Sequence, residues 1–294
     1  MGRLATDLLK DFYLGCPIWA HKAWVGELFT PDAKAPDYLR QYASVFNTVE
    51  GNSTFYGLPS EATVERWLED TPDGFRFCFK FPRSISHDRE LSNAEVETEA
   101  FFQRLSPLKE RLGPMFLQLP PSFGPDGLKL LSHYLKNLPG DGAFAVEVRH
   151  PVFFDGAESE LNGLLAENGA DRAIFDTRGL HGAEGGDATT VASQRRKPSL
   201  PVRPVATGPR PFVRFVAHPE VEENRALLDA WARTVASWIA EGKTPFFFAH
   251  APDDFYAPRV ARLFHGLLSE ARDVGEMPEW PAEKPQLKKQ LSLF

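Results

Sequence analysis

The chain has 294 residues, of which 43% are apolar and 25% charged, and a formal net charge of −7. This composition is typical of a soluble protein with a large core, and the negative charge excludes a protein that coats nucleic acid through a basic face. No apolar run approaches the ~20 residues of a membrane span, and the first residues lack the apolar stretch of a signal peptide. We therefore expect a cytoplasmic protein without a membrane segment.

Eight short apolar segments recur along the chain, and helical patterns lie between them. The segments are Phe12–Cys16, Phe46–Glu50, Phe75–Lys80, Met115–Leu119, Ala143–Val148, Ala173–Asp176, Phe212–Val216 and Phe246–Ala249. Continuous apolar runs indicate strands buried on both faces of a parallel sheet. The alternation predicts a single (β/α)8 TIM-type barrel over residues 1–276. An open doubly wound sheet is the alternative, but no glycine-rich phosphate fingerprint follows the first strand.

One interval interrupts the alternation of strands and helices. Gly179–Pro211 contains repeated Gly and Pro and the basic run Arg195-Arg196-Lys197, without a convincing helical pattern. We expect an irregular loop that replaces much of the sixth helix. It is either a solvated insertion or a lid that contacts an anion over the barrel mouth.

Polar and ionisable residues stand at the end of nearly every predicted strand. Burying so many charges without a function is costly, and the C-terminal strand ends carry the site in such barrels, so the pattern predicts a site there. The candidate catalytic residues are Glu50, Lys80 and Glu147. The candidate substrate-binding residues are Trp19, Asn52, Ser53, Tyr56, Gln118, Arg149, His150, Asp176, Arg214 and His250.

Several chemistries fit these residues. Glu50 and Glu147 suit an acid/base or nucleophile pair, as in glycoside hydrolysis, if their carboxyls lie about 5–10 Å apart. Lys80 suits a Schiff base if burial lowers its pKa, and together with Arg149 and Arg214 it suits a clamp for phosphate or carboxylate. The histidines with Glu50, Glu147 and Asp176 could bind a divalent metal that activates water, but no H-x-H or H-E-x-x-H spacing supports a metal specifically, and the sequence leaves the cofactor open. The mixture of Lys and Arg favours a small anionic ligand.

Three functional hypotheses follow. In the first, the chain is an enzyme, a hydrolase or lyase, in which Glu50 and Glu147 perform proton or water chemistry on an anionic, phosphate-bearing substrate, of which nucleic-acid-derived compounds are one candidate class. In the second, the barrel binds a nucleotide, a nucleic-acid end or a protein without chemistry. In the third, the chain is a carbohydrate hydrolase, with aromatic side chains such as Trp19 and Tyr56 as stacking platforms.

Several motifs resemble a known family. They are G-C-P-x-W from Gly15, Y-A-x-x-F-x-T-V-E-x-N-S-T-F-Y from Tyr42, L-G-P-M-F-L-Q-L-P-P from Leu112 and E-V-R-H-P from Glu147. Together they resemble domain of unknown function 72, also called the YecE-like family, over about Tyr13 to Leu268. The resemblance implies a TIM-type barrel and supplies no reaction.

The residues after the last predicted helix form a separate segment. Residues 277–294 contain Pro and Lys without a strand or helix pattern, which predicts a flexible tail. The terminal Gln290, Leu291, Leu293 and Phe294 resemble the peptide by which bacterial proteins dock on the DNA polymerase sliding clamp. In such a peptide, apolar side chains fill a preformed cleft while the Gln anchors one end. The alternative is an apolar end that folds back onto its own barrel.

Overall fold

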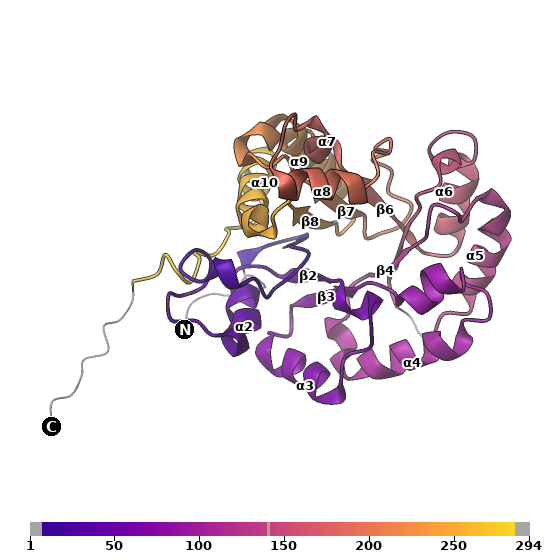
Figure 1. Cartoon of the computed structure of the whole chain (residues 1–294), viewed down its shortest axis with the longest axis horizontal. Helices are drawn as coiled ribbons and strands as arrows, with labels where there is room; N and C mark the ends of the chain where they lie inside the picture. Colours follow the sequence, from indigo (N-terminus) through magenta and orange to yellow (C-terminus); the bar gives the residue numbers. More distant parts are fainter. Residues whose placement is uncertain (1–7, 140–141, 286–294) are drawn as a thin grey trace, which may run out of the picture.

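A computed structural model describes residues 8–139 and 142–285 of the chain. It contains eight parallel strands, each followed by helical structure, and the helices surround the strands (Figure 1). The strands are β1 (Tyr13–Gly15), β2 (Thr48–Gly51), β3 (Arg76–Phe79), β4 (Met115–Gln118), β5 (Phe144–Glu147), β6 (Asp171–Asp176), β7 (Phe212–Val216) and β8 (Phe246–His250). All eight overlap the predicted apolar segments.

The strands form two parallel sheets. Six of them form a curled sheet in the order β1-β8-β7-β6-β5-β4, and β2 pairs with β3. The pair is joined to its neighbours by isolated hydrogen bonds, from Glu50 N to Cys16 O (3.1 Å) and from Phe81 N to Phe116 O (3.0 Å). A Cβ at Gly15 would lie 2.2 Å from the Thr48 carbonyl oxygen, so β1 approaches β2 closely where the residue is glycine. The predicted barrel is thus observed as a six-stranded half-barrel and a two-stranded pair.

The main helices alternate with the strands as the sequence predicts. They are α2 (Tyr38–Ala43), α3 (Glu61–Asp70), α4 (Glu95–Leu105), α5 (Leu128–Lys136), α6 (Glu158–Glu167), α7 (Arg178–Gly182), α8 (Ala188–Arg196), α9 (Arg225–Ala240) and α10 (Ala257–Ala271). Within the described residues, no helix is both long and apolar enough to cross a membrane.

The expectation that Gly179–Pro211 has no regular helix is wrong for its first half, which contains α8 and most of α7. Asp187 caps α8 by accepting a hydrogen bond from Thr190 N (2.7 Å). The buried residues of α8 are polar, Thr190 and Ser193, so the segment carries no apolar periodicity. The part after α8 is irregular, as predicted.

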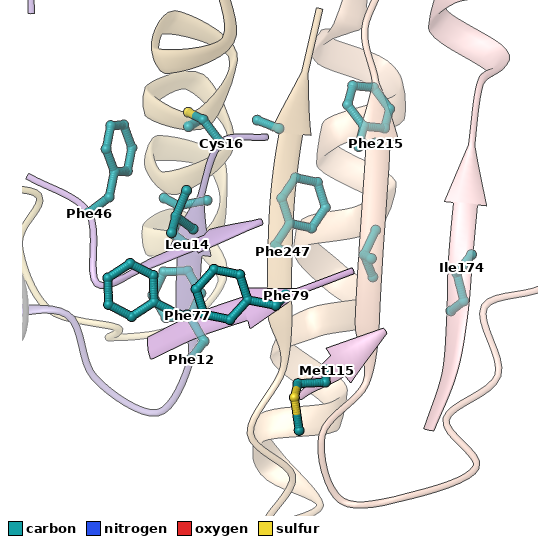
Figure 2. Close-up of a cluster of buried hydrophobic side chains, with 14 of the residues drawn as sticks. Phe12, Leu14, Cys16, Phe46, Phe77, Phe79, Met115, Ile174, Phe215 and Phe247 are labelled. Carbon is teal, nitrogen blue, oxygen red and sulfur yellow. The ribbon is translucent and has the colours of Figure 1, made fainter. Parts of the chain in front are cut away.

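Most of the hydrophobic core lies in two layers, and Phe175, Leu180 and Val216 form a third, small cluster. The larger layer fills the space between the strands and the helices, and Figure 2 shows part of it, with Leu14, Phe247 and Phe215 on β1, β8 and β7. The smaller layer lies on the opposite faces of the strands and includes Cys78, Phe116, Ala145, Ala173, Phe212, Phe246 and Phe248. Because strand side chains alternate between faces, each layer takes every second residue.

The first part of the predicted tail packs against the barrel. Trp280 is 3% exposed, and the guanidinium carbon of Arg262, on α10, lies 3.6 Å from the centre of its ring. Arg262 also forms two hydrogen bonds with the Glu283 carboxylate, of 2.7 and 2.8 Å. The clamp-like residues from Gln290 onward lie outside the described residues.

Candidate functional site

A charged layer lies two residues beyond the inner apolar layer, at the C-terminal ends of the strands. The spacing is the same on several strands: Cys78 precedes Lys80, Phe116 precedes Gln118, Ala145 precedes Glu147, Phe212 precedes Arg214 and Phe248 precedes His250. A spacing of two residues keeps the side chains on one face, so the polar groups converge at one end of the sheet. The polar cluster therefore follows from the regular alternation of side chains along the strands and is not a chance group of surface residues.

Arg214 is the centre of the cluster. Its Nε and Nη2 donate to the two carboxylate oxygens of Glu50 at 2.8 and 2.7 Å, and its Nη1 donates to Glu147. All three side chains are nearly completely buried. The guanidinium carbon lies 4.9 Å from the ring centre of Phe116 and 5.0 Å from that of Phe175, which gives the cation an aromatic floor.

The two glutamates are held as carboxylates. Burial raises the pKa of Glu50, but the charges of Arg214 and His250 and their hydrogen bonds lower it, so that it lies well below its usual value. Burial likewise raises the pKa of Glu147, and Arg214, Arg149 and Lys80 lower it below its usual value. Asn52 Nδ2 donates to Glu50 at 2.8 Å. Both carboxylates are thus ionised at neutral pH, and each of their oxygens accepts at least one hydrogen bond.

Lys80 and Arg149 lie at one side of this network and share a neutral partner. Lys80 Nζ (2.9 Å) and Arg149 Nη2 (3.0 Å) both donate to Gln118 Oε1. Arg149 Nε also donates to Glu147 at 2.7 Å. Among the described residues, no carboxylate oxygen lies within 4 Å of Lys80 Nζ, which instead faces the Phe55 ring at 3.9 Å. We call Lys80, Arg149 and Gln118 the anion seat.

The surroundings of Lys80 in the anion seat lower the pKa of its side chain. Burial lowers the pKa of Lys80 to about 8, and the neighbouring charges of Arg214 and Arg149 add to this effect, while Glu147 opposes it. His87 lies nearby, and burial together with the charges of Lys80 and Arg83 lowers its pKa as well. An amine with a pKa close to neutral is able both to carry charge and to exchange protons under physiological conditions.

The cluster contains eight of the thirteen predicted site residues: Glu50, Asn52, Lys80, Gln118, Glu147, Arg149, Arg214 and His250. His250 Nε2 lies 3.1 Å from Glu50. The sequence analysis missed Phe55, Phe116 and Phe175, the aromatic residues beneath the cations. Two of them lie on strand positions in phase with the charged layer, which is the signal that identifies them.

The other five predicted residues lie outside the cluster. Trp19 packs edge-on against Trp67 and Phe77 in the layer between strands and helices. His150 Nδ1 accepts a hydrogen bond from Val152 N at 3.3 Å. Ser53 and Tyr56 are exposed, and the Tyr56 ring packs edge-on with the neighbouring Phe55 ring.

Asp176 faces away from the cluster. Its carboxylate is completely buried and accepts hydrogen bonds from Trp231 Nε1 on α9 (2.8 Å) and from Arg178 Nη2 (2.7 Å). No group of three or more His, Cys, Asp or Glu side chains within residues 8–139 and 142–285 is arranged to hold a metal ion.

A large cavity of about 1780 Å³ lies at the opposite end of the strands. It is lined by the first residues of several strands, among them Arg76, Met115 and Phe246, and by parts of α4 and α5. Within the part of the chain that the structure describes, no ion pair joins two of its charged lining residues. Buried, convergent groups with perturbed pKa values are the better marker of a site, so we place the candidate site at the charged end.

The fold and the cluster define a class of protein: a parallel α/β half-barrel with a buried ionic network at its C-terminal mouth. The chain belongs to the family described as protein of unknown function DUF72, whose sequence model matches residues 13–285. The UPF0759 protein YecE of Escherichia coli K12 is 40% identical over 274 residues, which cover 92% of this chain and 98% of that protein. The UPF0759 protein YunF of Bacillus subtilis is 28% identical over 166 residues, 53% of this chain and 57% of that protein.

Solved structures of the same family share the fold. A DUF72 protein from Enterococcus faecalis V583 aligns with a TM-score of 0.67 at 19% identity and covers 91% of this chain and 99% of its own. A DUF72 protein from Thermotoga maritima MSB8 aligns with a TM-score of 0.65 at 23% identity and covers 88% of this chain and 99% of its own. The family membership predicted from the motifs is confirmed.

Proposed function

We propose that the chain is an enzyme that binds a phosphate-bearing substrate at the mouth of a (β/α)8-type barrel, with the anion seat as the phosphate site. One observation carries the proposal: Lys80 and Arg149 donate to the same neutral oxygen of Gln118, and Lys80 has no carboxylate partner among the described residues. A buried ammonium without a counter-ion is unfavourable, and a bound anion removes that penalty. The planar guanidinium of Arg149 adds directional donors for phosphate oxygens.

The geometry favours different roles for the charged residues from those that the sequence predicts. The sequence predicts Glu50 and Glu147 as the proton-transfer pair, but both have lowered pKa values and share the guanidinium of Arg214. We propose that this network is a rigid scaffold that orients Arg149, Asn52 and His250. Lys80, with a pKa of about 8, is then the group best suited to proton transfer. Glycoside hydrolysis by the two glutamates is disfavoured, because it needs one carboxyl with a raised pKa.

Titration with inorganic phosphate and pyrophosphate by calorimetry tests the anion seat. We expect saturable binding to the parent protein and at least tenfold weaker binding to Lys80→Met. Lys22→Met removes an exposed lysine and is the matched control, with unchanged affinity. Equal affinity of the parent and Lys80→Met for both ligands would overturn the anion seat.

A product screen separates the enzyme from a binding module. Phosphate esters and phosphodiesters, including nucleotides and short single-stranded DNA, are incubated with the parent protein and with Lys80→Met. Turnover that Lys80→Met abolishes supports the enzyme. Tight binding of the same compounds without any product favours the non-catalytic module.

We further propose that the terminal residues Gln290, Leu291, Leu293 and Phe294 recruit the protein to the DNA sliding clamp, which would deliver it to nucleic-acid-derived substrates. The proposal rests on the sequence of this segment, in which apolar side chains follow a Gln. A peptide of residues 284–294 titrated into purified clamp should bind saturably, and the Gln290→Ala and Leu293→Ala peptides should bind at least tenfold more weakly. Equal behaviour of the three peptides would refute the docking.

A further inference from the structure

Close to Arg214 and His250, three polar side chains outside the anion seat have unused hydrogen-bonding capacity. They are Lys197, Asp254 and His21, from the segment after α8 and from the loops after β8 and β1. None of the three is among the predicted site residues. Their surroundings, taken one at a time, indicate what they are able to bind.

Lys197 follows α8 directly, and hydrogen bonds tie this part of the chain to residues just after the C-terminal end of β6. Thr177, at the end of β6, donates through Oγ1 to the Pro198 carbonyl at 2.9 Å, and His181 Nε2 donates to the Lys197 carbonyl at 2.9 Å. Lys197 Nζ donates to Ser193 Oγ at 3.0 Å. Within the described residues it has no carboxylate within 4 Å, so the ammonium retains free donors.

Asp254 is the first residue of a short 3-10 helix, η9 (Asp254–Tyr256), in the loop after β8. The preceding Asp253 accepts a hydrogen bond from Phe255 N at 2.9 Å, and the indole of Trp24 donates to the Phe255 carbonyl at 3.1 Å. No group in the described part of the chain donates a hydrogen bond to the Asp254 carboxylate. Burial raises its pKa, and the nearby charges of His250 and Lys197 offset part of that effect.

His21 completes the group. Its ring packs against that of Trp24, with 5.5 Å between the centres, and its Nε2 lies 3.9 Å from Asp253 Oδ1. The other ring nitrogen, Nδ1, is buried and has no hydrogen-bond partner among residues 8–139 and 142–285. Because Trp24 contacts both His21 and η9, one buried indole fixes the two loops relative to each other.

We propose that Lys197, Asp254 and His21 form a second subsite, which binds the hydroxyl groups of a sugar or polyol whose phosphate occupies the anion seat. A hydroxyl group both donates and accepts, so it is complementary to a free ammonium donor beside a free carboxylate acceptor. The charges of Lys197 and Asp254 oppose each other, so this subsite does not select a second anion. The substrate class is therefore a sugar or polyol phosphate, and the inference rests on the proposed anion seat.

Calorimetry with two probes separates the two subsites. Inorganic phosphate reports on the anion seat alone, and D-ribose 5-phosphate reports on both subsites. We expect the parent to bind D-ribose 5-phosphate at least tenfold more tightly than phosphate. Lys197→Met and Asp254→Asn should each weaken D-ribose 5-phosphate binding about tenfold and leave phosphate binding within twofold. Arg195→Met, which removes an exposed charge from α8 two residues before Lys197, should change neither affinity.

The outcomes distinguish the two proposals. If the parent binds phosphate and D-ribose 5-phosphate equally well, or if Lys197→Met and Asp254→Asn weaken both ligands equally, the second subsite is refuted and the anion seat stands. If neither ligand binds the parent, the anion seat fails and the second subsite fails with it. Far-UV circular dichroism confirms that each variant is folded, and Asp254→Asn, which preserves the shape of the side chain, serves if Lys197→Met does not fold.

Discussion

The Arg214 network and the anion seat lie side by side in one charged layer, but their cations have different partners and oppositely shifted pKa values. Arg214 meets two buried carboxylates and has a pKa above its usual value, because Glu50 and Glu147 outweigh the effect of its burial. Lys80 meets one neutral oxygen and has a pKa lowered to about 8. In the first arrangement the buried charges have partners of opposite sign, whereas in the second the ammonium has no carboxylate partner among the described residues. Four predictions test this contrast.

Removal of Arg214 should have the largest effect. Arg214→Met leaves Glu50 and Glu147 buried without their cation, so we expect the free energy of unfolding to fall by about 3–5 kcal/mol. Urea denaturation followed by circular dichroism measures the change. Arg233→Met is the control, because Arg233 is exposed and pairs with Asp229 on the helix surface, where less than about 1 kcal/mol is expected. A loss for Arg214→Met no larger than that of the control would contradict the scaffold role.

Removal of Lys80 should raise the stability of the protein rather than lower it. The pKa of Lys80 is about 8 in the folded protein and 10.5 in an unperturbed side chain, so below pH 8 the folded state bears the cost of a buried charge. We expect Lys80→Met to raise the free energy of unfolding at pH 7 by about 1–3 kcal/mol in the absence of ligand. The parent should also gain stability between pH 8 and pH 10.5, where the unfolded chain binds more protons than the folded one.

The rise in stability above pH 8 should be smaller in Lys80→Met than in the parent. Urea denaturation at pH 7, 9 and 10 measures it. Destabilisation by Lys80→Met comparable to that by Arg214→Met would show that the two cations have the same structural role.

The sequence was sufficient for most of this layer. Glu50, Lys80, Glu147 and Arg214 each end or lie within an apolar run, and a spacing of two residues on parallel strands brings them to one face. The sequence did not predict which face a side chain takes on β6, where the start of the strand is ambiguous. β6 begins at Asp171, before the predicted start, and Asp176 falls on the outer face, because neighbouring residues of a strand point to opposite sides.

Long-range contacts were also beyond the sequence. Lys197 reaches the mouth through a polar helix without apolar periodicity, and Asp254 is placed by an indole from the other end of the chain. Trp19 follows β1 but packs against Trp67 of α3, which no local pattern indicates. Strand order and face are periodic properties, whereas these placements depend on tertiary packing.

The pH dependence of anion binding should be a moderate effect. Sulfate keeps its charge from pH 6 to pH 10, so any change in its affinity comes from the protein. We expect constant affinity below pH 8 and a fall of about tenfold per pH unit above it, as Lys80 loses its proton. Lys80→Arg keeps the charge at all these pH values and should bind sulfate with little pH dependence. A parent affinity that is unchanged between pH 7 and pH 10 would exclude Lys80 as a ligand of the anion.

Substitution of Asp176 should have the smallest effect on the site. Its buried carboxylate accepts from Trp231 and Arg178 on the outer face of β6, so it belongs to the packing between strand and helix. We expect Asp176→Asn to lower the free energy of unfolding by about 1 kcal/mol, through weaker hydrogen bonds, and to change phosphate affinity less than twofold. Gln118→Leu is the comparison, because it removes the shared acceptor of the anion seat and should weaken phosphate binding about tenfold. A larger loss of phosphate affinity for Asp176→Asn than for Gln118→Leu would contradict this assignment. It would mean that the Asp176 carboxylate contacts the ligand and belongs to the binding site rather than to the packing between strand and helix.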